Sequence, residues 1–216
     1  MVEGAMRCLL PLVPLLLLAS PAVAKAPGRP QPPPLVIACK DAFAKTASHR
    51  GLVRAYGAGN VTFETVNRPG GEVAKATVLF AKEPQRRVEI EWYDLKRRRL
   101  ASTITVFGED NQWSGPLGLR NGMTIAELEQ RAGKPFRING FGFDVAGAGH
   151  FEDTALADLP GGCGFDGYFE IEGGLPPDHL SRFIGEVEIP SNDPDLMTLK
   201  PRLWMYTLTY PSPNAE

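Results

Sequence analysis

The pattern of apolar and polar positions marks one short helix with clear ends. Residues 122–135 read Gly-Met-Thr-Ile-Ala-Glu-Leu-Glu-Gln-Arg-Ala-Gly-Lys-Pro. Thr124 and Glu127 have the spacing of a capping box, in which each side chain accepts from the other residue's backbone N–H. Apolar residues recur inside the stretch at helical spacing, and Gly133 is suited to end the helix. A helix this short is marginal alone in water, so we expect it to pack against a sheet.

Alternation of apolar and polar residues predicts strands in both halves of the chain. After a helical pattern at residues 41–56, the first half carries strand patterns at residues 60–66, 75–80, 87–92 and 100–107. The second half has its capped helix from Thr124 and strand patterns at residues 136–144, 168–172 and 203–210. A short connection joins the strands 75–80 and 87–92, as in a hairpin, so we expect antiparallel pairing. Together these patterns predict an α+β fold.

The two halves show a similar order of elements, which favours an internal duplication. The offset 124 − 48 = 76 relates Ser48, Leu52 and Gly57 to Thr124, Leu128 and Gly133. A second match relates residues 88–91 to 169–172 with the offset 169 − 88 = 81. Chance similarity between short amphipathic segments is the alternative. We predict two tandem modules, residues 35–118 and 119–216, each a short helix packed on an antiparallel sheet of about three to four strands.

The stretch 122–135 also carries a family resemblance. Its Gly-Met-Thr-x-x-Glu-Leu … Gly-x-Pro pattern resembles the signature of the SmpA/OmlA family of outer-membrane assembly lipoproteins and of beta-lactamase-inhibitory-protein-like modules. Residues 133–136 and 140–144 are similar to runs in bacterial secreted proteins of unknown function. The resemblance implies tandem helix-plus-sheet modules whose sheets form one concave surface. No lipid-attachment cysteine stands at the expected mature N-terminus, and no functional residue is carried over from the family.

The start of the chain has the pattern of a secretory signal peptide. One basic residue, Arg7, precedes a leucine-rich run, and Ala22-Val-Ala24 is a small-x-small cleavage signature. We predict cleavage after Ala24, which makes residues 1–24 the signal peptide. An uncleaved membrane anchor is the alternative, but the apolar run is short and contains two prolines. Residues 25–34 are rich in proline and predict a linker.

Cleavage would leave two cysteines, Cys39 and Cys163. In an oxidising compartment two lone cysteines most simply form one disulfide, and two buried free thiols are the alternative. The sequence therefore predicts a secreted or periplasmic protein with one disulfide.

Composition restricts the kinds of partner. The formal net charge is −2, which favours neither a nucleic acid nor an anionic membrane surface. No second apolar run is long enough to span a bilayer, so we expect no membrane span after signal cleavage. We expect a protein partner in the cell envelope.

The densest group of polar candidates lies in the glycine-rich stretch 140–153. Asp144 and His150 stand there beside Glu152 and Asp153. Metal sites need alternating carboxylates or a second His or Cys nearby, and this stretch has neither, so we predict no metal and no cofactor. A solvated strand connection is the simpler interpretation. A hydrolase or other small-molecule enzyme centred on Asp144 and His150 is the alternative function.

Two other groups are candidate binding residues. Arg97 and Arg98 lie in the basic run 96–99 between two strands, where they either bind an anion or deter strand pairing at a solvated edge. Aromatic residues either line a protein-binding face or fill the core; we keep Trp113 as a binding candidate and expect core positions for Trp92 and Trp204. The interpretation that best joins these observations is a non-catalytic binding or envelope-assembly support module that uses a sheet face and loops.

Overall fold

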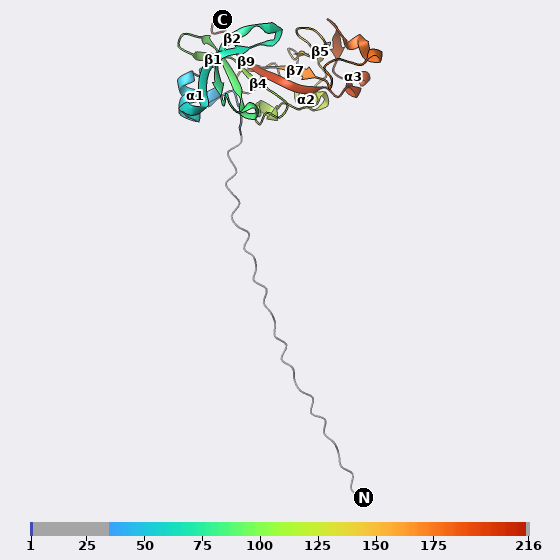
Figure 1. Cartoon of the computed structure of the whole chain (residues 1–216), viewed down its shortest axis with the longest axis horizontal. Coiled ribbons are helices and arrows are strands. Elements are labelled where there is room, and N and C mark those ends of the chain that lie inside the picture. The colour runs from blue at the N-terminus through green and yellow to red at the C-terminus, as the bar shows by residue number, and fades with distance from the viewer. Residues whose placement is uncertain (2–34, 215–216) are drawn as a thin grey trace. The chain divides into compact units, whose positions relative to one another are not determined.

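The computed structural model describes Met1 and residues 35–214 (Figure 1). The predicted linker 25–34, and the predicted signal peptide apart from Met1, lie outside the described residues.

The fold is α+β, as the sequence predicts, and its sheets are antiparallel. The α-helices are α1 (His49–Tyr56), α2 (Ile125–Ala132) and α3 (Pro194–Thr198). The short 3-10 helices are η1 (Asp41–Phe43), η2 (Ala58–Asn60), η3 (Pro69–Gly71), η4 (Pro84–Arg86), η5 (Pro116–Gly118) and η6 (Asp178–Phe183). The strands are β1 (Val61–Asn67), β2 (Val73–Leu79), β3 (Val88–Asp94), β4 (Arg99–Phe107), β5 (Arg137–Asn139), β6 (Gly149–His150), β7 (Gly164–Glu170), β8 (Glu188–Pro190) and β9 (Arg202–Thr209).

One six-stranded sheet runs through both halves of the chain. Its strand order is β1-β2-β3-β4-β9-β7, and a second sheet of three strands has the order β6-β5-β8. The first half supplies β1 to β4, whereas β9 and β7 come from the second half. The halves meet where β4 pairs with β9, so the two predicted modules share a single sheet.

Both main helices begin at hydroxyl caps. The capping box is present: Thr124 Oγ1 accepts from the Glu127 N–H at 3.2 Å, and Glu127 accepts from the Thr124 N–H at 2.9 Å. Ser48 Oγ accepts from the Gly51 N–H at 3.1 Å and starts α1. The helix predicted from residue 41 is therefore too long, because Ser48 has extended backbone and α1 begins only at His49.

The two capped helices connect to the sheet in the same way. The Leu100 N–H donates to Ala47 O, and the Leu203 N–H donates to Met123 O, both at 2.9 Å. Each contact joins the residue before a helix cap to the start of a strand. In the pairing of these strands, Asp94 lies opposite Arg99, and Glu170 lies opposite Arg202.

The main core lies on one face of the large sheet, the inner face, and a smaller buried cluster of Val66, Ala76 and Val78 lies on the other face. A row of cross-strand neighbours on this inner face is apolar and buried: Ile90, Ile104, Leu208 and Phe165. Leu52 of α1 and Leu128 of α2 belong to the same hydrophobic cluster. Figure 1 shows both helices along the lower edge of the folded part, with β1 and β2 at the upper edge. The helices therefore cover the inner face and leave the outer face free of α1 and α2.

The predicted disulfide pair is close in space. The sulfur atoms of Cys39 and Cys163 lie at bonding distance, with their Cα atoms 6.2 Å apart, and both residues are buried. The link joins the segment before α1 to the start of β7 across 124 positions of sequence. Gly161 packs against this link so closely that a Cβ there would lie 2.6 Å from Cys39 O. The disulfide thus ties the first described segment of the chain to the second half of the sheet.

We expect the double substitution of Cys39 and Cys163 by Ala to lower the free energy of unfolding by about 2–4 kcal/mol, because the unfolded chain regains the entropy of a long open loop. Urea denaturation of the oxidised protein and the variant measures this. The control is the variant in dithiothreitol, which should unfold as it does without reductant. Equal midpoints for the oxidised wild type and the variant would contradict the expectation.

Candidate binding groove

The outer face of the large sheet carries a polar row across β3, β4, β9 and β7, next to the small apolar cluster on β1 and β2. One residue along from the inner row, the cross-strand neighbours are Glu89, Thr105, Thr207 and Asp166. Successive residues of a strand point to opposite faces, so this row faces away from the helices. The outer face is unevenly covered: Thr105 is buried, while Asp166 on β7 is exposed.

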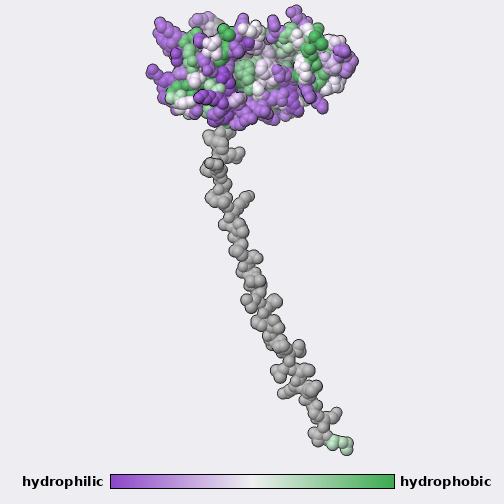
Figure 2. All heavy atoms as spheres, viewed as in Figure 1, coloured by the Kyte–Doolittle hydropathy of each residue, from purple (hydrophilic) through white to green (hydrophobic). Residues whose placement is uncertain are grey.

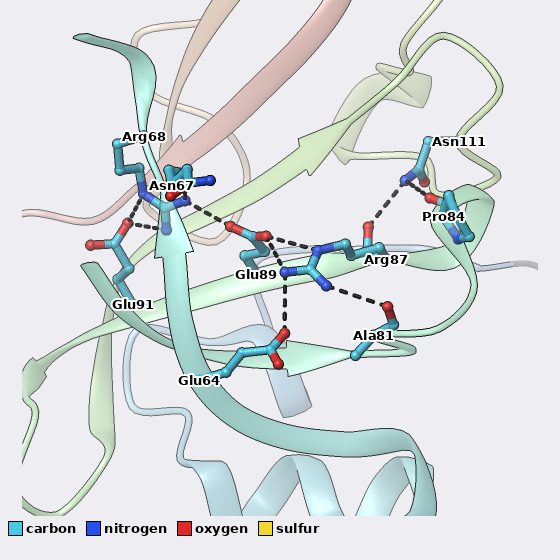
Figure 3. Close-up of polar contacts among 9 residues, drawn as sticks. All are labelled: Glu64, Asn67, Arg68, Ala81, Pro84, Arg87, Glu89, Glu91 and Asn111. Carbon is cyan, nitrogen blue, oxygen red and sulfur yellow. Dashed lines mark hydrogen bonds and ion pairs between the residues drawn. The ribbon is translucent and has the colours of Figure 1, made fainter. Parts of the chain in front are cut away.

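An ion-pair network covers the first-half end of the outer face (Figure 3). Arg68, just after β1, lies 2.7 Å from Glu89 and 2.5 Å from Glu91 on β3. Arg87 shares Glu89 at 2.7 Å and reaches Glu64 on β1 at 3.2 Å. The Glu89 side chain is only 5% exposed, and the two guanidinium groups offset the cost of burying it. The network holds the end of β1 over the outer face.

A groove of about 920 Å³ lies between this end of β1 and the second half of the chain. Its walls come from the end of β1, the end of β4, β7 with the residues after it, β9 and the loop 141–146. The lining residues are Asn67, Arg68, Pro69, Phe107, Phe141, Gly142, Phe143, Asp144, Ala146, Tyr168, Phe169, Glu170, Ile171, Gly173, Gly174 and Trp204. We call this the aromatic groove.

Half-buried aromatic rings form much of the lining of the groove. Phe107 of β4 and Trp204 of β9 pack with ring centroids 5.9 Å apart, and Tyr168 and Phe143 are also half-buried. The sequence-based expectation that Trp204 is a core residue is wrong. The pairing of β7 with β9 shifts between Tyr168 and Phe169, so Trp204 becomes the extra residue of a bulge and leaves the inner face. Trp92 lies in the core, as expected.

The carboxylate of Glu170 is partly buried and lies near a second negative charge. Partial burial, and secondly the negative charge of Glu109, raise the pKa of Glu170 above its ordinary value. Burial likewise raises the pKa of Tyr168, with a further contribution from Asp166. Among the described residues, neither Glu170 nor Glu109 has an ion pair with Lys or Arg. Arg202, opposite Glu170, instead donates to Gly122 O at 2.9 Å.

The structure separates the two residues of the predicted glycine-rich site. Asp144 is exposed and lines the aromatic groove together with a smaller neighbouring hollow. His150, on β6, lines another hollow, where its Nε2 lies 2.8 Å from Asn139 Oδ1 and its Nδ1 lies 3.9 Å from Glu152. Asp144 therefore belongs to the groove and His150 does not.

The other three predicted binding residues lie away from the groove. Trp113 is 1% exposed, its indole N–H donates to Arg86 O at 2.8 Å, and it packs against Phe43. Trp113 is thus a core residue with no surface to offer a partner. Arg97, at the β3–β4 turn, forms a 3.3 Å ion pair with Asp94. The guanidinium of Arg98 lies 4.0 Å from the ring centre of Phe63.

Exposed apolar side chains gather beside the groove on its second-half side. Gly142, which lines the groove, packs so closely that a Cβ there would lie 2.7 Å from Leu175 and 3.6 Å from Ile184. Leu175 is 55% and Ile184 40% exposed. Figure 2 shows hydrophilic residues over much of the surface, with a green apolar group at the upper right, the region that Figure 1 labels β5. The rim of the groove is therefore apolar on this side.

The described residues offer no group of three or more His, Cys, Asp or Glu side chains placed to hold a metal ion. Within the same residues, no helix has the length and apolar character needed to cross a membrane. Comparison of the chain with protein-family models, curated protein sequences and solved structures finds no match.

Sequence reasoning missed Arg68, Phe107 and Glu170. Arg68 was hidden in the turn Asn67-Arg-Pro-Gly-Gly71, whose glycines and proline explain the residue pattern without any role for the charge. The alternation in β3 was a usable signal, because Glu89 and Glu91 place two carboxylates on one face of a strand and require a nearby cation.

We expect Arg68→Leu to lower the free energy of unfolding by about 3 kcal/mol, because it leaves the buried Glu89 carboxylate with one cation fewer. Arg97→Leu is the matched control: its side chain is 69% exposed, so its loss should change stability by less than about 0.5 kcal/mol. Chemical denaturation at pH 7 measures both. Equal losses for the two variants would show that the network does not hold β1 in place.

Proposed function

We propose that this protein is a non-catalytic binding module that holds a protein partner of the cell envelope in the aromatic groove. The observation that carries the proposal is the placement of Phe107 and Trp204 on the outer face, where the core makes no use of them. Aromatic residues that combine a large contact area with little conformational entropy dominate the energetics of protein interfaces. The apolar rim at Leu175 and Ile184 would extend the contact beyond the groove.

The buried network beside the groove supports the same proposal. A binding site gains affinity when its walls are already in place before the partner arrives. Arg68 is held by Glu89 and Glu91 on one side, and Phe107 and Trp204 lie on paired strands on the other. The walls of the groove therefore lose little conformational entropy when a partner binds.

The proposed location is the periplasm or the extracellular space. The signal-like start of the chain supports secretion, and the Cys39–Cys163 pair at disulfide distance fits an oxidising compartment. An internal duplication, proposed from the repeated order of helix and strands, would explain why α1 and α2 are attached to the sheet by equivalent backbone contacts. Such tandem modules would give the partner one continuous sheet face.

We expect a photo-crosslinking phenylalanine at position 143 to capture one defined partner in cells, because Phe143 is half-buried and lines the groove. The matched control places the same group at position 95, where Leu95 is 47% exposed at the β3–β4 turn. Mass spectrometry identifies the adduct, and calorimetry with the purified partner measures its affinity. Trp204→Ala should weaken that affinity by about 2 kcal/mol or more. Identical adducts at both positions, or unchanged affinity in Trp204→Ala, would contradict the proposal.

A further inference from the structure

We infer that the aromatic groove recognises a cationic group, an alkylammonium or guanidinium side chain of the bound partner. The inference rests on the proposed function and specifies its chemistry. It follows from three features of the groove: its aromatic rings, its carboxylates without an ion pair among the described residues, and the ion pairs of Arg68, the one Lys or Arg among the described lining residues.

The aromatic faces are the first feature. Phe107, Tyr168 and Trp204 come from three different strands and line one hollow. The faces of aromatic rings carry negative electrostatic potential and attract ammonium and guanidinium groups, and Trp attracts them most strongly. The fold already uses this attraction elsewhere, since the guanidinium of Arg86 lies 3.8 Å from the ring centre of Phe80.

The carboxylates are the second feature. Glu170 and Asp144 both line the groove and are exposed, so a ligand can reach them. No Lys or Arg side chain of the described residues lies within 4.0 Å of either carboxylate. Glu109 adds a further negative charge close enough to affect Glu170. A bound cation would relieve this repulsion.

The state of Arg68 is the third feature. Arg68 is the one Lys or Arg among the described lining residues, and its guanidinium pairs with Glu89 at 2.7 Å and Glu91 at 2.5 Å. The full network sets the two guanidinium groups of Arg68 and Arg87 against three carboxylates, those of Glu64, Glu89 and Glu91. Arg68 therefore does not supply the charge that Glu170 and Asp144 lack. An anionic ligand would meet net negative charge.

The test uses three tripeptide amides, acetyl-Gly-X-Gly-NH2, in which X is lysine, norleucine or glutamate. The whole protein is titrated with each peptide, and the indole N–H resonances of its three tryptophans are followed by NMR. Trp204 reports on the groove. Trp92 and Trp113 are internal controls, because their indoles are buried and donate to Thr77 Oγ1 and Arg86 O.

We expect the lysine peptide to shift the Trp204 resonance saturably, at least about fivefold more tightly than the norleucine peptide, with no binding of the glutamate peptide. Glu170→Gln should weaken lysine-peptide binding by about fivefold. Glu172→Gln is the matched control, because it removes the same charge from an exposed side chain that does not line the groove, and it should leave Kd within about twofold. Unchanged Trp92 and Trp113 resonances establish that each variant is folded.

The pH dependence gives a second readout. Protonation of Glu170 removes its attraction for a cation, so binding of the lysine peptide should weaken as the pH falls through the raised pKa of this carboxyl. Glu170→Gln should lose that part of the pH dependence, and Glu172→Gln should keep it.

Two results would overturn the inference. Equal affinity for the lysine and norleucine peptides would mean that the groove binds the apolar part of the side chain and that the positive charge does not contribute to affinity. Capture of a partner at position 143, together with no response of Trp204 to the lysine peptide, would support the binding function and contradict the recognition of a cation. Failure of the binding function itself would appear separately, as adducts that do not differ between positions 143 and 95.

Discussion

The pairing of β4 with β9 is the interaction on which the rest of the structure depends. Each half of the chain has its own capped helix, but neither half alone makes the six-stranded sheet. Because Ile104 lies opposite Leu208 in this pairing, the inner faces of the two halves become one apolar surface. The same register places Phe107 opposite Met205, beside Trp204, on the outer face. One set of backbone hydrogen bonds thus joins the core and forms the floor of the groove.

The outer face has a different balance of forces from the inner one. The inner face is stabilised by the burial of aliphatic side chains, which does not depend on the orientation of the contacting groups. The first-half end of the outer face is held by charge pairs, which are costly to bury and stabilise only when their geometry is complete. Arg68 and Arg87 form such pairs there, and both contact Glu89. The groove begins where this ion-pair network ends, and it is lined by Glu170 and Asp144, which have no Lys or Arg side chain of the described residues within 4.0 Å.

Local signals in the sequence predict local structure well in this chain. The spacing of Thr124 and Glu127 predicts the capping box because both hydrogen bonds form within three residues. The α+β class follows from the alternation in the strands, and the Cys39–Cys163 pair follows from compartment and count. These features depend on composition or on near neighbours.

The groove could not be predicted in this way, because its parts are distant in sequence. Trp204 leaves the core through a bulge that only the pairing with β7 reveals. Arg68 contacts Glu89 and Glu91, which lie 21 and 23 positions away in the sequence. Its own position is in a turn pattern that does not indicate an ion pair. Trp113 shows the opposite error, since an aromatic residue in a predicted loop is buried by long-range packing against Phe43.

The Cys39–Cys163 link has a mechanical consequence. A pulling force applied between residue 35 and the C-terminal end would pass along the chain to Cys39, across the sulfur–sulfur bond to Cys163, and then through β7 to β9. The covalent load path bypasses residues 40–162, which include α1, α2 and β1 to β4. If the protein is tethered at one end and its partner pulls at the other, the end of β1 and the Phe107 wall of the groove lie outside the segment that bears tension.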